Sequence, residues 1–309
     1  MNYVVTGGAG FIGSHIVEYL VNHRHDVTVL DNLFTGKKDN IQDLLEDSHL
    51  NFVQGSITDL DLLNEVFRDA DGIFHQAAIP SVPRSIKDPV ATHEVNVNGT
   101  LNVLVSAKEC GVKKVVYASS SSVYGDTPSL PKVETMSPNP KSPYAVSKLT
   151  GEYYCKIFSD VYGVRTVALR YFNVFGPRQD PESQYAAVIP RFITRALAGQ
   201  PPIMYGDGTQ TRDFTYVKDV VQANAKAMES CAEGVFNVAY NTRISLLSLV
   251  NHIAEETGVR LNPLFEPARP GDIHDSQADI SAARAAFRYA PEYTVRTGLK
   301  ETIAWYRKK

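Results

Sequence analysis

The chain has 309 residues and a formal net charge of −3, and 43% of its residues are hydrophobic. This length suffices for one large domain or two modest ones, whereas the charge offers no basic stripe to nucleic acid. No apolar run is long enough to span a bilayer. A glycine-rich turn that begins at residue 7 leaves no room for a signal peptide, so we expect a cytoplasmic protein. The three cysteines lack metal-site or disulfide-framework spacing, so no metal is expected.

Short apolar runs alternate with segments of helical spacing. The runs predict strands at residues 3–5, 27–30, 51–55, 72–75, 114–119 and 165–170. The segments between them predict helices that begin after residue 10 and lie near 40–46, 60–67, 90–110 and 143–162. Strands without strict polar alternation, separated by helices, indicate a parallel sheet covered on both faces. The predicted fold is therefore α/β, a doubly wound parallel sheet that binds ligands at the carboxyl ends of its strands.

The segment Thr6–Gly13, Thr-Gly-Gly-Ala-Gly-Phe-Ile-Gly, joins the first predicted strand to the first predicted helix. The missing Cβ permits a tight turn at Gly7, a close approach to a diphosphate at Gly10, and close helix packing at Gly13. The N–H groups of the helix N-terminus then face the anion. The second predicted strand ends in Asp31, at the distance where a carboxylate meets the adenosine ribose hydroxyls, so the pattern predicts a dinucleotide site.

The character of the sequence changes near residue 172. We assign residues 1–172, which carry the alternating strands and helices, to a dinucleotide-binding Rossmann domain. Loops rich in Pro, Gly and polar residues follow, so residues 173–309 are predicted to form mainly a smaller α/β lobe that binds the substrate. A helical pattern and then a strand pattern indicate that the chain returns to the sheet near 213–240.

Tyr144 and Lys148 lie four residues apart near the start of a predicted helix that Pro143 can open, so their side chains share one face. A tyrosine with a pKa of about 10 is a poor base at neutral pH. A lysine ammonium and an oxidised nicotinamide beside it would favour the phenolate. The pair is a candidate general base, although the same spacing also occurs in surface pairs. The serine-rich segment Ser119–Gly125 follows a predicted strand and so lies at the ligand-binding edge.

Several segments together resemble the extended short-chain dehydrogenase/reductase superfamily, with the nucleotide-sugar 4-epimerases as the nearest match. The segments that carry the resemblance are Thr6–Gly13, Asp31–Leu33, Asn96–Thr100, Ser119–Gly125, Ser142–Lys148 and Arg170–Pro177. By this resemblance, Ser120 hydrogen-bonds the sugar 4-hydroxyl, Tyr144 is the base, and Lys148 holds the nicotinamide ribose and lowers the pKa of Tyr144. The implied reaction passes hydride from C4 of a UDP-sugar to NAD and back to the other face of a 4-keto sugar.

The resemblance also implies a set of cofactor contacts. They are Gly7, Gly10, Phe11, Ile12, Gly13, Asp31, Asn32, Ser56, Ile57, Gln76, Ala77, Ala78, Asn96, Tyr144, Lys148 and Tyr171. Asp31 would repel a 2′-phosphate, which favours NAD over NADP, and Lys37 and Lys38 nearby are interpreted as solvated loop charges. Ser56 stands where the family often carries an acidic residue that reaches the adenine, so a weaker or different adenine contact is expected.

The implied substrate contacts come from both halves of the chain. They are Ser81, Arg84, Ser120, Ser121, Tyr144, Asn173, Val188, Arg212, Arg269, Asp272 and Ser276. Of these, Asn173, Arg212 and Arg269 correspond to diphosphate and ribose contacts, and an arginine fork suits phosphate oxygens. His75 and His274 need no role in this chemistry and are expected to be packed or partly exposed.

Two departures within the family pattern bear on the sugar. Ser276 stands four residues after Asp272, where epimerases restricted to glucose and galactose tend to carry a bulky tyrosine, so an N-acetyl group should fit beside C2. The segment Ser81–Ser85 is similar to the one that faces the hexose in epimerases of N-acetylhexosamines. We therefore expect a UDP-GlcNAc/UDP-GalNAc 4-epimerase that also accepts UDP-glucose and UDP-galactose.

Three alternatives remain open. Arg84 could meet the carboxylate of a UDP-uronic acid. A 4,6-dehydratase would need an acid and a base where this chain has Ser121 and Ser122, which disfavours it. A non-catalytic NAD-binding sensor or scaffold would commonly lose Tyr144, Lys148 or the glycines, all of which are present.

The predicted helix 143–162 carries an apolar stripe wider than one buried face requires. Packing against the sheet is one explanation. The resemblance implies another, a homodimer in which this helix and the 90–110 helix pair with their copies.

Overall fold

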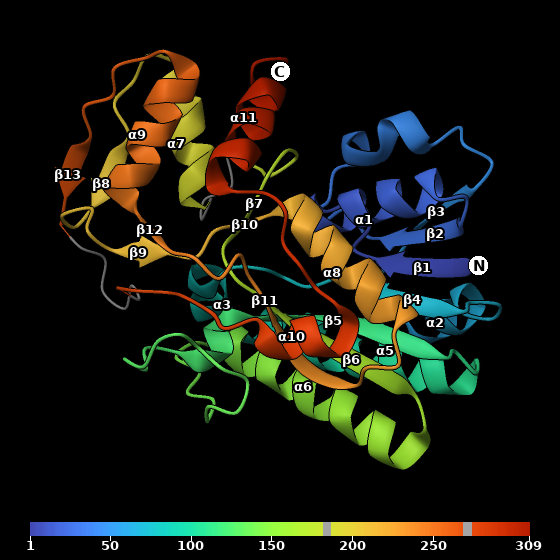
Figure 1. Ribbon diagram of the computed structural model, residues 1–309. Helices are drawn as coiled ribbons and strands as arrows, with labels where there is room; N and C mark the ends of the chain where they lie inside the picture. The colour runs from blue at the N-terminus through green and yellow to red at the C-terminus, as the bar shows by residue number, and fades with distance from the viewer. Residues whose placement is uncertain (182–186, 268–273) are drawn as a thin grey trace.

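The computed structural model describes residues 1–181, 187–267 and 274–309 (Figure 1). Within these residues a seven-stranded parallel sheet has the order β11-β6-β5-β4-β1-β2-β3. Its strands are β1 (Asn2–Thr6), β2 (Asp26–Asp31), β3 (Leu50–Gln54), β4 (Gly72–His75), β5 (Lys114–Ser120), β6 (Arg165–Tyr171) and β11 (Gly234–Val238). The order reverses between β1 and β4, the place where doubly wound sheets bind ligands. The predicted fold class is confirmed.

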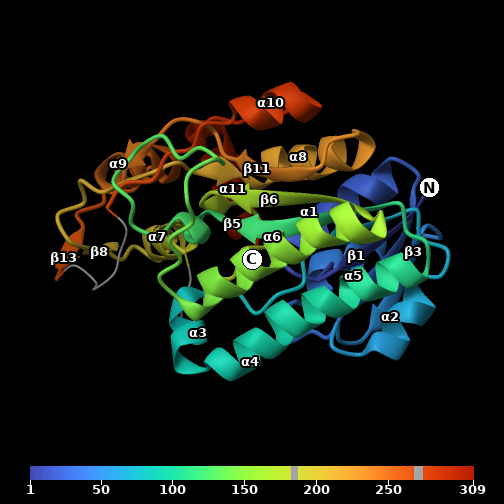
Figure 2. The ribbon, with the colours of Figure 1, turned by 90° about the horizontal axis from the view of Figure 1, so that it is seen from below.

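Helices cover both faces of this sheet. On one face lie α1 (Phe11–Asn22) and α8 (Val217–Glu229), which pack against each other (Figure 1). On the other face lie α2 (Leu60–Val66), α5 (Gly99–Glu109) and α6 (Pro143–Tyr162), and Figure 2 shows α5 and α6 running side by side. Both faces of the sheet are therefore buried.

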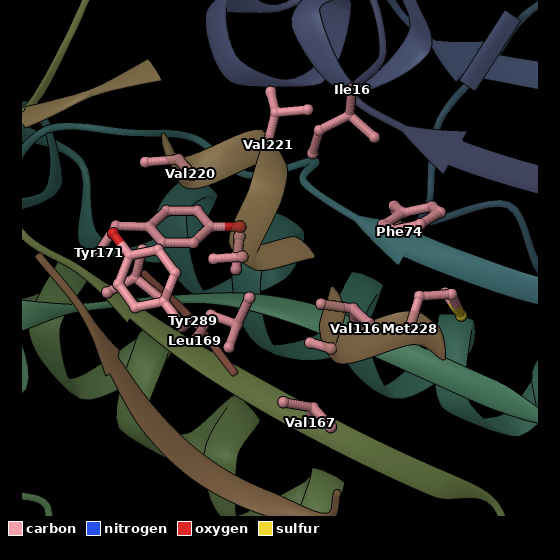
Figure 3. Close-up of a cluster of buried hydrophobic side chains, with 14 of the residues drawn as sticks. Ile16, Phe74, Val116, Val167, Leu169, Tyr171, Val220, Val221, Met228 and Tyr289 are labelled. Carbon is pink, nitrogen blue, oxygen red and sulfur yellow. The ribbon is translucent and has the colours of Figure 1, made fainter. Parts of the chain in front are cut away.

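The core on the α1 and α8 face combines side chains from strands and helices (Figure 3). Val116 of β5 and Leu169 of β6 belong to one cluster with Ile16 of α1 and Val220 of α8. The neighbouring strand residue Val115 belongs to the core on the opposite face, because successive strand residues point to opposite sides. This double burial explains why the apolar runs lack polar alternation.

After β6 the chain enters a second lobe with its own core, which includes Phe192, Leu249 and Ile303. Its helices are α7 (Val188–Leu197), α9 (Leu246–Thr257) and α11 (Val295–Tyr306). Its described strands pair as β7 (Val174–Phe175) with β10 (Thr215–Tyr216), β8 (Ile203–Tyr205) with β13 (Leu264–Glu266), and β9 (Thr211–Arg212) with β12 (Ile244–Ser245). The chain then rejoins the sheet through α8 and β11, and α10 (Ser281–Phe287) packs beside β11.

Two predicted helices differ from the structure. The 90–110 helix consists of α4 (Pro89–His93), a π-helical segment η2 (Glu94–Asn98) and α5. Apolar periodicity cannot reveal one wider turn inside a longer helix. The predicted helix near 40–46 is the 3₁₀ helix η1 (Lys38–Leu44), and two further short helices are α3 (Val82–Lys87) and η3 (Ser121–Tyr124). None of the helices in the described ranges is long and apolar enough to cross a membrane.

Candidate active site

The turn between β1 and α1 leaves no space for side chains at two of its glycines. Gly7 has a φ of +70°, and a Cβ atom there would lie 2.7 Å from the backbone nitrogen of Ala77. A Cβ atom on Gly13 would collide with the carbonyl oxygen of Gly7. Gly10 is the N-cap of α1 and has no capping side chain, so the first N–H groups of the helix remain available to an anion.

Asp31 ends β2 with its carboxylate beside the glycine turn. Its Oδ2 accepts the N–H of Ala9 at 3.0 Å, and its Oδ1 accepts the N–H of Leu33 at 2.8 Å. Burial raises the pKa of Asp31, and these two hydrogen bonds act in the opposite direction. Asn32 accepts the N–H of Phe34 at 3.0 Å and shapes the following loop. The carboxylate is thus held in one place at the end of the strand.

The start of α1 and the loop after β2 reach toward the second lobe. Phe11 and Ile12 pack against the core of that lobe. Lys37 forms an ion pair with Asp180 at 3.1 Å, and Lys38 Nζ lies 5.1 Å from the ring centre of Phe52. Both lysines therefore have a contact within the protein.

Ser56 and Ile57 follow β3. The Ser56 hydroxyl lies 2.8 Å from Thr58 Oγ1 and accepts the Thr58 N–H at 3.2 Å. Ile57 is buried, and a Cβ atom on Gly99 would lie 2.6 Å from its Cδ1. The hydroxyl of Ser56 is thus used within its own turn.

Gln76, Ala77 and Ala78 continue from β4, alongside the glycine turn. Gln76 Nε2 donates to Asn224 Oδ1 at 3.2 Å, and its Oε1 accepts the Tyr171 hydroxyl at 3.2 Å. Asn224 Nδ2 in turn donates to the Tyr171 hydroxyl at 2.8 Å. Asn224 lies on α8, far along the chain, and no sequence pattern marked it. These side chains form a closed polar network next to the predicted cofactor segment.

Ser120, Tyr144 and Lys148 come together at the carboxyl end of β5. Ser120 is the last residue of this strand, and its side chain is hydrogen-bonded to that of Tyr144. The buried Lys148 Nζ donates to the carbonyl oxygen of Ala118 at 2.8 Å and lies 5.9 Å from the ring centre of Tyr144. The structure therefore places all three predicted catalytic side chains in one group.

Burial governs the protonation of this group. It lowers the pKa of Lys148 to about 8. It raises the pKa of Tyr144, while the hydrogen bond to Ser120 acts in the opposite direction. Lys148 therefore still carries most of its positive charge at neutral pH, and that charge favours the Tyr144 phenolate.

Three neighbouring features keep the end of β5 in place. Ser120 Oγ accepts the N–H of Ser122 at 3.1 Å, which starts η3 at Ser121. One residue earlier, Ser119 donates to Glu152 of α6. Glu152 forms a buried, bidentate ion pair with Arg170 of β6, with N–O distances of 2.8 and 2.7 Å. Sequence reasoning did not identify this pair, because its partners are 18 residues apart.

Asn96 lies in the π-helical segment and uses its side chain on the protein itself. Its Oδ1 accepts the N–H of Ile79 at 2.7 Å, and its Nδ2 donates to the carbonyl oxygen of Ile79 at 3.1 Å. Nδ2 also donates to Ser147 Oγ at 3.1 Å. Asn96 therefore anchors the chain that follows the predicted cofactor segment.

A cavity of about 240 Å³ opens in the second lobe. Its lining includes Asn173, Val188 and Arg212, three of the predicted substrate residues, together with Phe192 and Tyr205, which the sequence did not indicate. Arg212 Nη1 donates to two backbone carbonyl oxygens, at 2.9 and 2.8 Å, which fixes its guanidinium group. The cavity thus combines two cationic side chains, Arg191 and Arg212, with aromatic and aliphatic walls.

Ser276 lies beside this cavity. Asn173 Nδ2 donates to Ser276 Oγ at 3.4 Å and to the carbonyl oxygen of Asp213 at 3.2 Å. The N–H of Ser276 donates to the carbonyl oxygen of Thr211 at 3.1 Å. Arg269 and Asp272, the other predicted residues of this region, lie outside the described residues.

Ser81 and Arg84 lie at the start of α3, in the chain segment that follows β4. Ser81 is the N-cap of α3, and its hydroxyl accepts the N–H of Arg84 at 3.3 Å. The guanidinium carbon of Arg84 lies 5.5 Å from the ring centre of Phe34, in the loop after Asp31. Neither residue is in the lining of the second-lobe cavity. Within the described parts of the chain, no cluster of three or more His, Cys, Asp or Glu side chains could hold a metal ion.

Residues 3–241 match the model of the NAD dependent epimerase/dehydratase family. The chain belongs to this family. Its resemblance to the extended short-chain dehydrogenases/reductases of the UDP-sugar 4-epimerase type is thereby confirmed, as are its character as an enzyme and its use of NAD.

Three similar proteins illustrate the range within the family. UDP-glucose 4-epimerase of Mycolicibacterium smegmatis is 38% identical over 100% of this chain and 99% of its own. UDP-N-acetylglucosamine 4-epimerase of Methanobrevibacter ruminantium M1, solved with UDP-N-acetylmuramic acid, is 42% identical over 99% and 98% of the two chains, with a TM-score of 0.96. UDP-glucuronic acid 4-epimerase of Bacillus cereus, solved with UDP-glucuronic acid and NAD, is 34% identical over 100% and 99%, with a TM-score of 0.92.

Proposed function

We propose that this chain interconverts the C4 epimers of UDP-N-acetylhexosamines, and of the smaller UDP-hexoses, through a transient 4-keto sugar. The observation that carries the proposal is the grouping of Ser120, Tyr144 and Lys148 on the sheet edge that also bears the glycine turn. In this proposal the sheet domain binds NAD and the second lobe binds the UDP moiety.

The side chains divide the chemistry at C4 between them. Tyr144 takes the proton of the 4-hydroxyl, directly or through Ser120, to which it is hydrogen-bonded. The Lys148 ammonium, 5.9 Å from the ring centre of Tyr144, favours the phenolate and so opposes the effect of burial, which raises the pKa of Tyr144. NAD+ held beside this group would supply the redox chemistry, as acceptor and then donor of the C4 hydride. A sugar that turned its other face to the cofactor between the two transfers would leave with C4 inverted.

The carboxyl edge of the sheet provides a suitable binding site for NAD. We assign the diphosphate to the glycine turn and the N-terminus of α1, where backbone N–H groups are available. We assign the adenosine ribose to Asp31, whose carboxylate is held at the end of β2. The Ser56 hydroxyl is used within its own turn, which supports the expectation of a weaker or different adenine contact there.

The second-lobe cavity suits a nucleoside diphosphate. The rings of Phe192 and Tyr205 offer flat apolar surface to the base, and Arg212 offers a cation to a phosphate. In this proposal Ser276, which is hydrogen-bonded to Asn173 of the cavity lining, faces the sugar, and its small side chain leaves room for an N-acetyl group. This size argument is the basis for including UDP-GlcNAc and UDP-GalNAc.

The proposal is tested with purified protein and no added cofactor. Separate samples receive UDP-GlcNAc, UDP-glucose and UDP-glucuronic acid, and the C4 epimers are followed by proton NMR. We expect conversion of UDP-GlcNAc and of UDP-glucose. Conversion of UDP-glucose alone would contradict the argument from Ser276, and conversion of UDP-glucuronic acid alone would replace the proposed substrate class. No conversion of any sugar, even with NAD added, would contradict the function.

We also propose that the protein is a homodimer. Val146, Tyr153, Ile157 and Val161 follow one another at helical spacing along the outer face of α6, and Tyr153 and Val161 are 59% and 64% exposed. Val90 on the adjacent α4 is exposed as well. A second copy that pairs α6 with its own α6 would bury this stripe. In sedimentation velocity, Ile157→Glu is expected to convert dimer to monomer, whereas a monomeric wild type would contradict the assembly.

A further inference from the structure

A buried row of polar side chains connects the strand before the glycine turn to the π-helical segment. Thr6 Oγ1 lies 2.7 Å from His75 Nδ1, and His75 Nε2 lies 3.0 Å from Thr100 Oγ1. Thr6, His75 and Thr100 belong to β1, β4 and α5, and all three are at most 1% exposed. Because no water can reach these groups, each proton in the row needs an acceptor within it.

The direction of every hydrogen bond in the row follows from its ends. Thr100 Oγ1 donates to the carbonyl oxygen of Asn96 at 2.7 Å, so it can only accept from His75 and Nε2 must carry the proton. His75 Nδ1 then accepts from Thr6, whose oxygen receives the N–H of Ala77 at 3.4 Å. Burial lowers the pKa of His75 to about 3, in keeping with a neutral ring. The imidazole is therefore neutral, carries its one ring proton on Nε2, and links Thr6 to Thr100.

Beyond Thr100, the same connections continue to the backbone of Tyr144. Asn96 binds both backbone polar groups of Ile79 and donates its second amide proton to Ser147 Oγ. Ser147 Oγ donates to the carbonyl oxygen of Tyr144 at 2.8 Å. One continuous series of hydrogen bonds thus joins the glycine turn, the segment after β4 and the first turn of α6.

We propose that His75, protonated at Nε2, is a positioning residue. By holding Thr100 and the π-helical segment, it sets the distance between the predicted NAD-binding residues 76–78 and Tyr144. The inference rests on the proposed function, in which Tyr144 is the base and residues 76–78 lie along NAD. His75 touches neither NAD nor substrate. It acts through the placement of groups that do, and small displacements of reacting groups have large effects on rate.

Thr100→Val tests this role, because valine keeps the shape of threonine and removes the hydroxyl. We expect kcat to fall about tenfold or more while KM for the UDP-sugar changes by less than about twofold. Thr100→Ser, which restores the hydroxyl, should recover most of kcat. Thr6→Val interrupts the row at its other end and should have the same effect, which guards against a folding defect peculiar to one site.

Thr92→Val is the matched control. Thr92 is also 1% exposed and also donates to a carbonyl oxygen four residues earlier, that of Asp88 at 2.9 Å, and this hydrogen bond lies outside the row. We expect its kcat to stay within about twofold of wild type. Equal losses in Thr92→Val and Thr100→Val, or no recovery in Thr100→Ser, would overturn the proposal.

Two readouts do not depend on turnover and so separate this inference from the proposed function. Two-bond proton–nitrogen correlations of His75 should give the pattern of an Nε2-protonated ring, and an Nδ1-protonated pattern would overturn the proposal. NAD should dissociate several-fold faster from Thr100→Val than from Thr92→Val. If wild type converted no UDP-sugar, the proposed function would fail while these two measurements still decided the role of His75.

Discussion

The sheet domain and the second lobe build their parts of the site in different ways. In the sheet domain, the candidate residues stand at strand ends and in first helical turns, where the register of parallel strands fixes them. Ser120 of β5, for example, is paired in register with Tyr171 of β6. In the second lobe, Asn173, Tyr205 and Arg212 come from three separate short segments and meet only around the cavity.

This difference separates two tasks. A sheet edge that is buried on both faces holds reacting groups rigidly, as the proposed chemistry at C4 requires. Short strands and loops around a cavity can vary without disturbing that edge, which suits the proposed role of the second lobe in binding the UDP-sugar. Changes at Ser120, Tyr144 and Lys148 should therefore alter kcat with little effect on selectivity, and changes around the cavity should alter KM and selectivity.

The largest effect is expected from Tyr144→Phe, which removes the hydroxyl of the proposed base and leaves the ring in place. We expect kcat to fall by about 10²- to 10⁴-fold, with NAD content and thermal unfolding unchanged. Tyr162→Phe at the end of the same helix is the control and should behave as wild type. Retained turnover in Tyr144→Phe would refute the assignment of the base.

Arg212→Gln tests one of the two arginines in the cavity lining, the other being Arg191. Loss of a charge-assisted contact to a phosphate should raise KM for the UDP-sugar by about 10- to 100-fold and leave kcat nearly unchanged. Arg195→Gln on α7, outside the cavity lining, provides a control in the same lobe. A lower kcat with unchanged KM in steady-state kinetics would contradict the division of tasks between the two regions.

Ser276→Tyr tests the size argument. The added ring should clash with the N-acetyl group. We therefore expect kcat/KM for UDP-GlcNAc to fall by about 10-fold or more, while kcat/KM for UDP-glucose changes little. Ser276→Ala is the matched control and should keep both activities. Equal losses on both sugars would indicate that Ser276 does not face C2.

Lys148→Met tests the electrostatic role of Lys148 through the pH dependence of kcat. The acid limb of the kcat profile reports deprotonation of Tyr144 in the complex. Because a nearby ammonium lowers the pKa of Tyr144, its removal should move that limb to higher pH, by about one unit. Lys156→Met, exposed on the same helix, should leave the limb in place. A limb that stays put or moves to lower pH in Lys148→Met would contradict the electrostatic role of Lys148.

In both regions, the sequence predicts the residues that lie in local patterns and misses those whose partners are distant in the chain. Gly7, Asp31 and the spacing of Tyr144 and Lys148 lie within local strand–turn–helix patterns, so their positions follow from neighbouring residues. Asn224, Glu152 and the cavity residue Tyr205 carry no such pattern, because their partners are brought near only by tertiary folding. For the same reason, the sequence predicts only an ordinary packed histidine at His75, and its hydrogen bonds to Thr6 and Thr100 become evident only in the structure.

The most direct test of the central claim is to follow a deuterium label at C4. UDP-GlcNAc deuterated at C4 is incubated with the purified enzyme in ordinary water, and the epimeric product is examined by NMR and mass spectrometry. Hydride transfer to retained NAD and back predicts that the product keeps its deuterium at C4. Replacement of the label by solvent hydrogen would contradict the 4-keto mechanism, because it would mean that C4 loses a proton rather than a hydride.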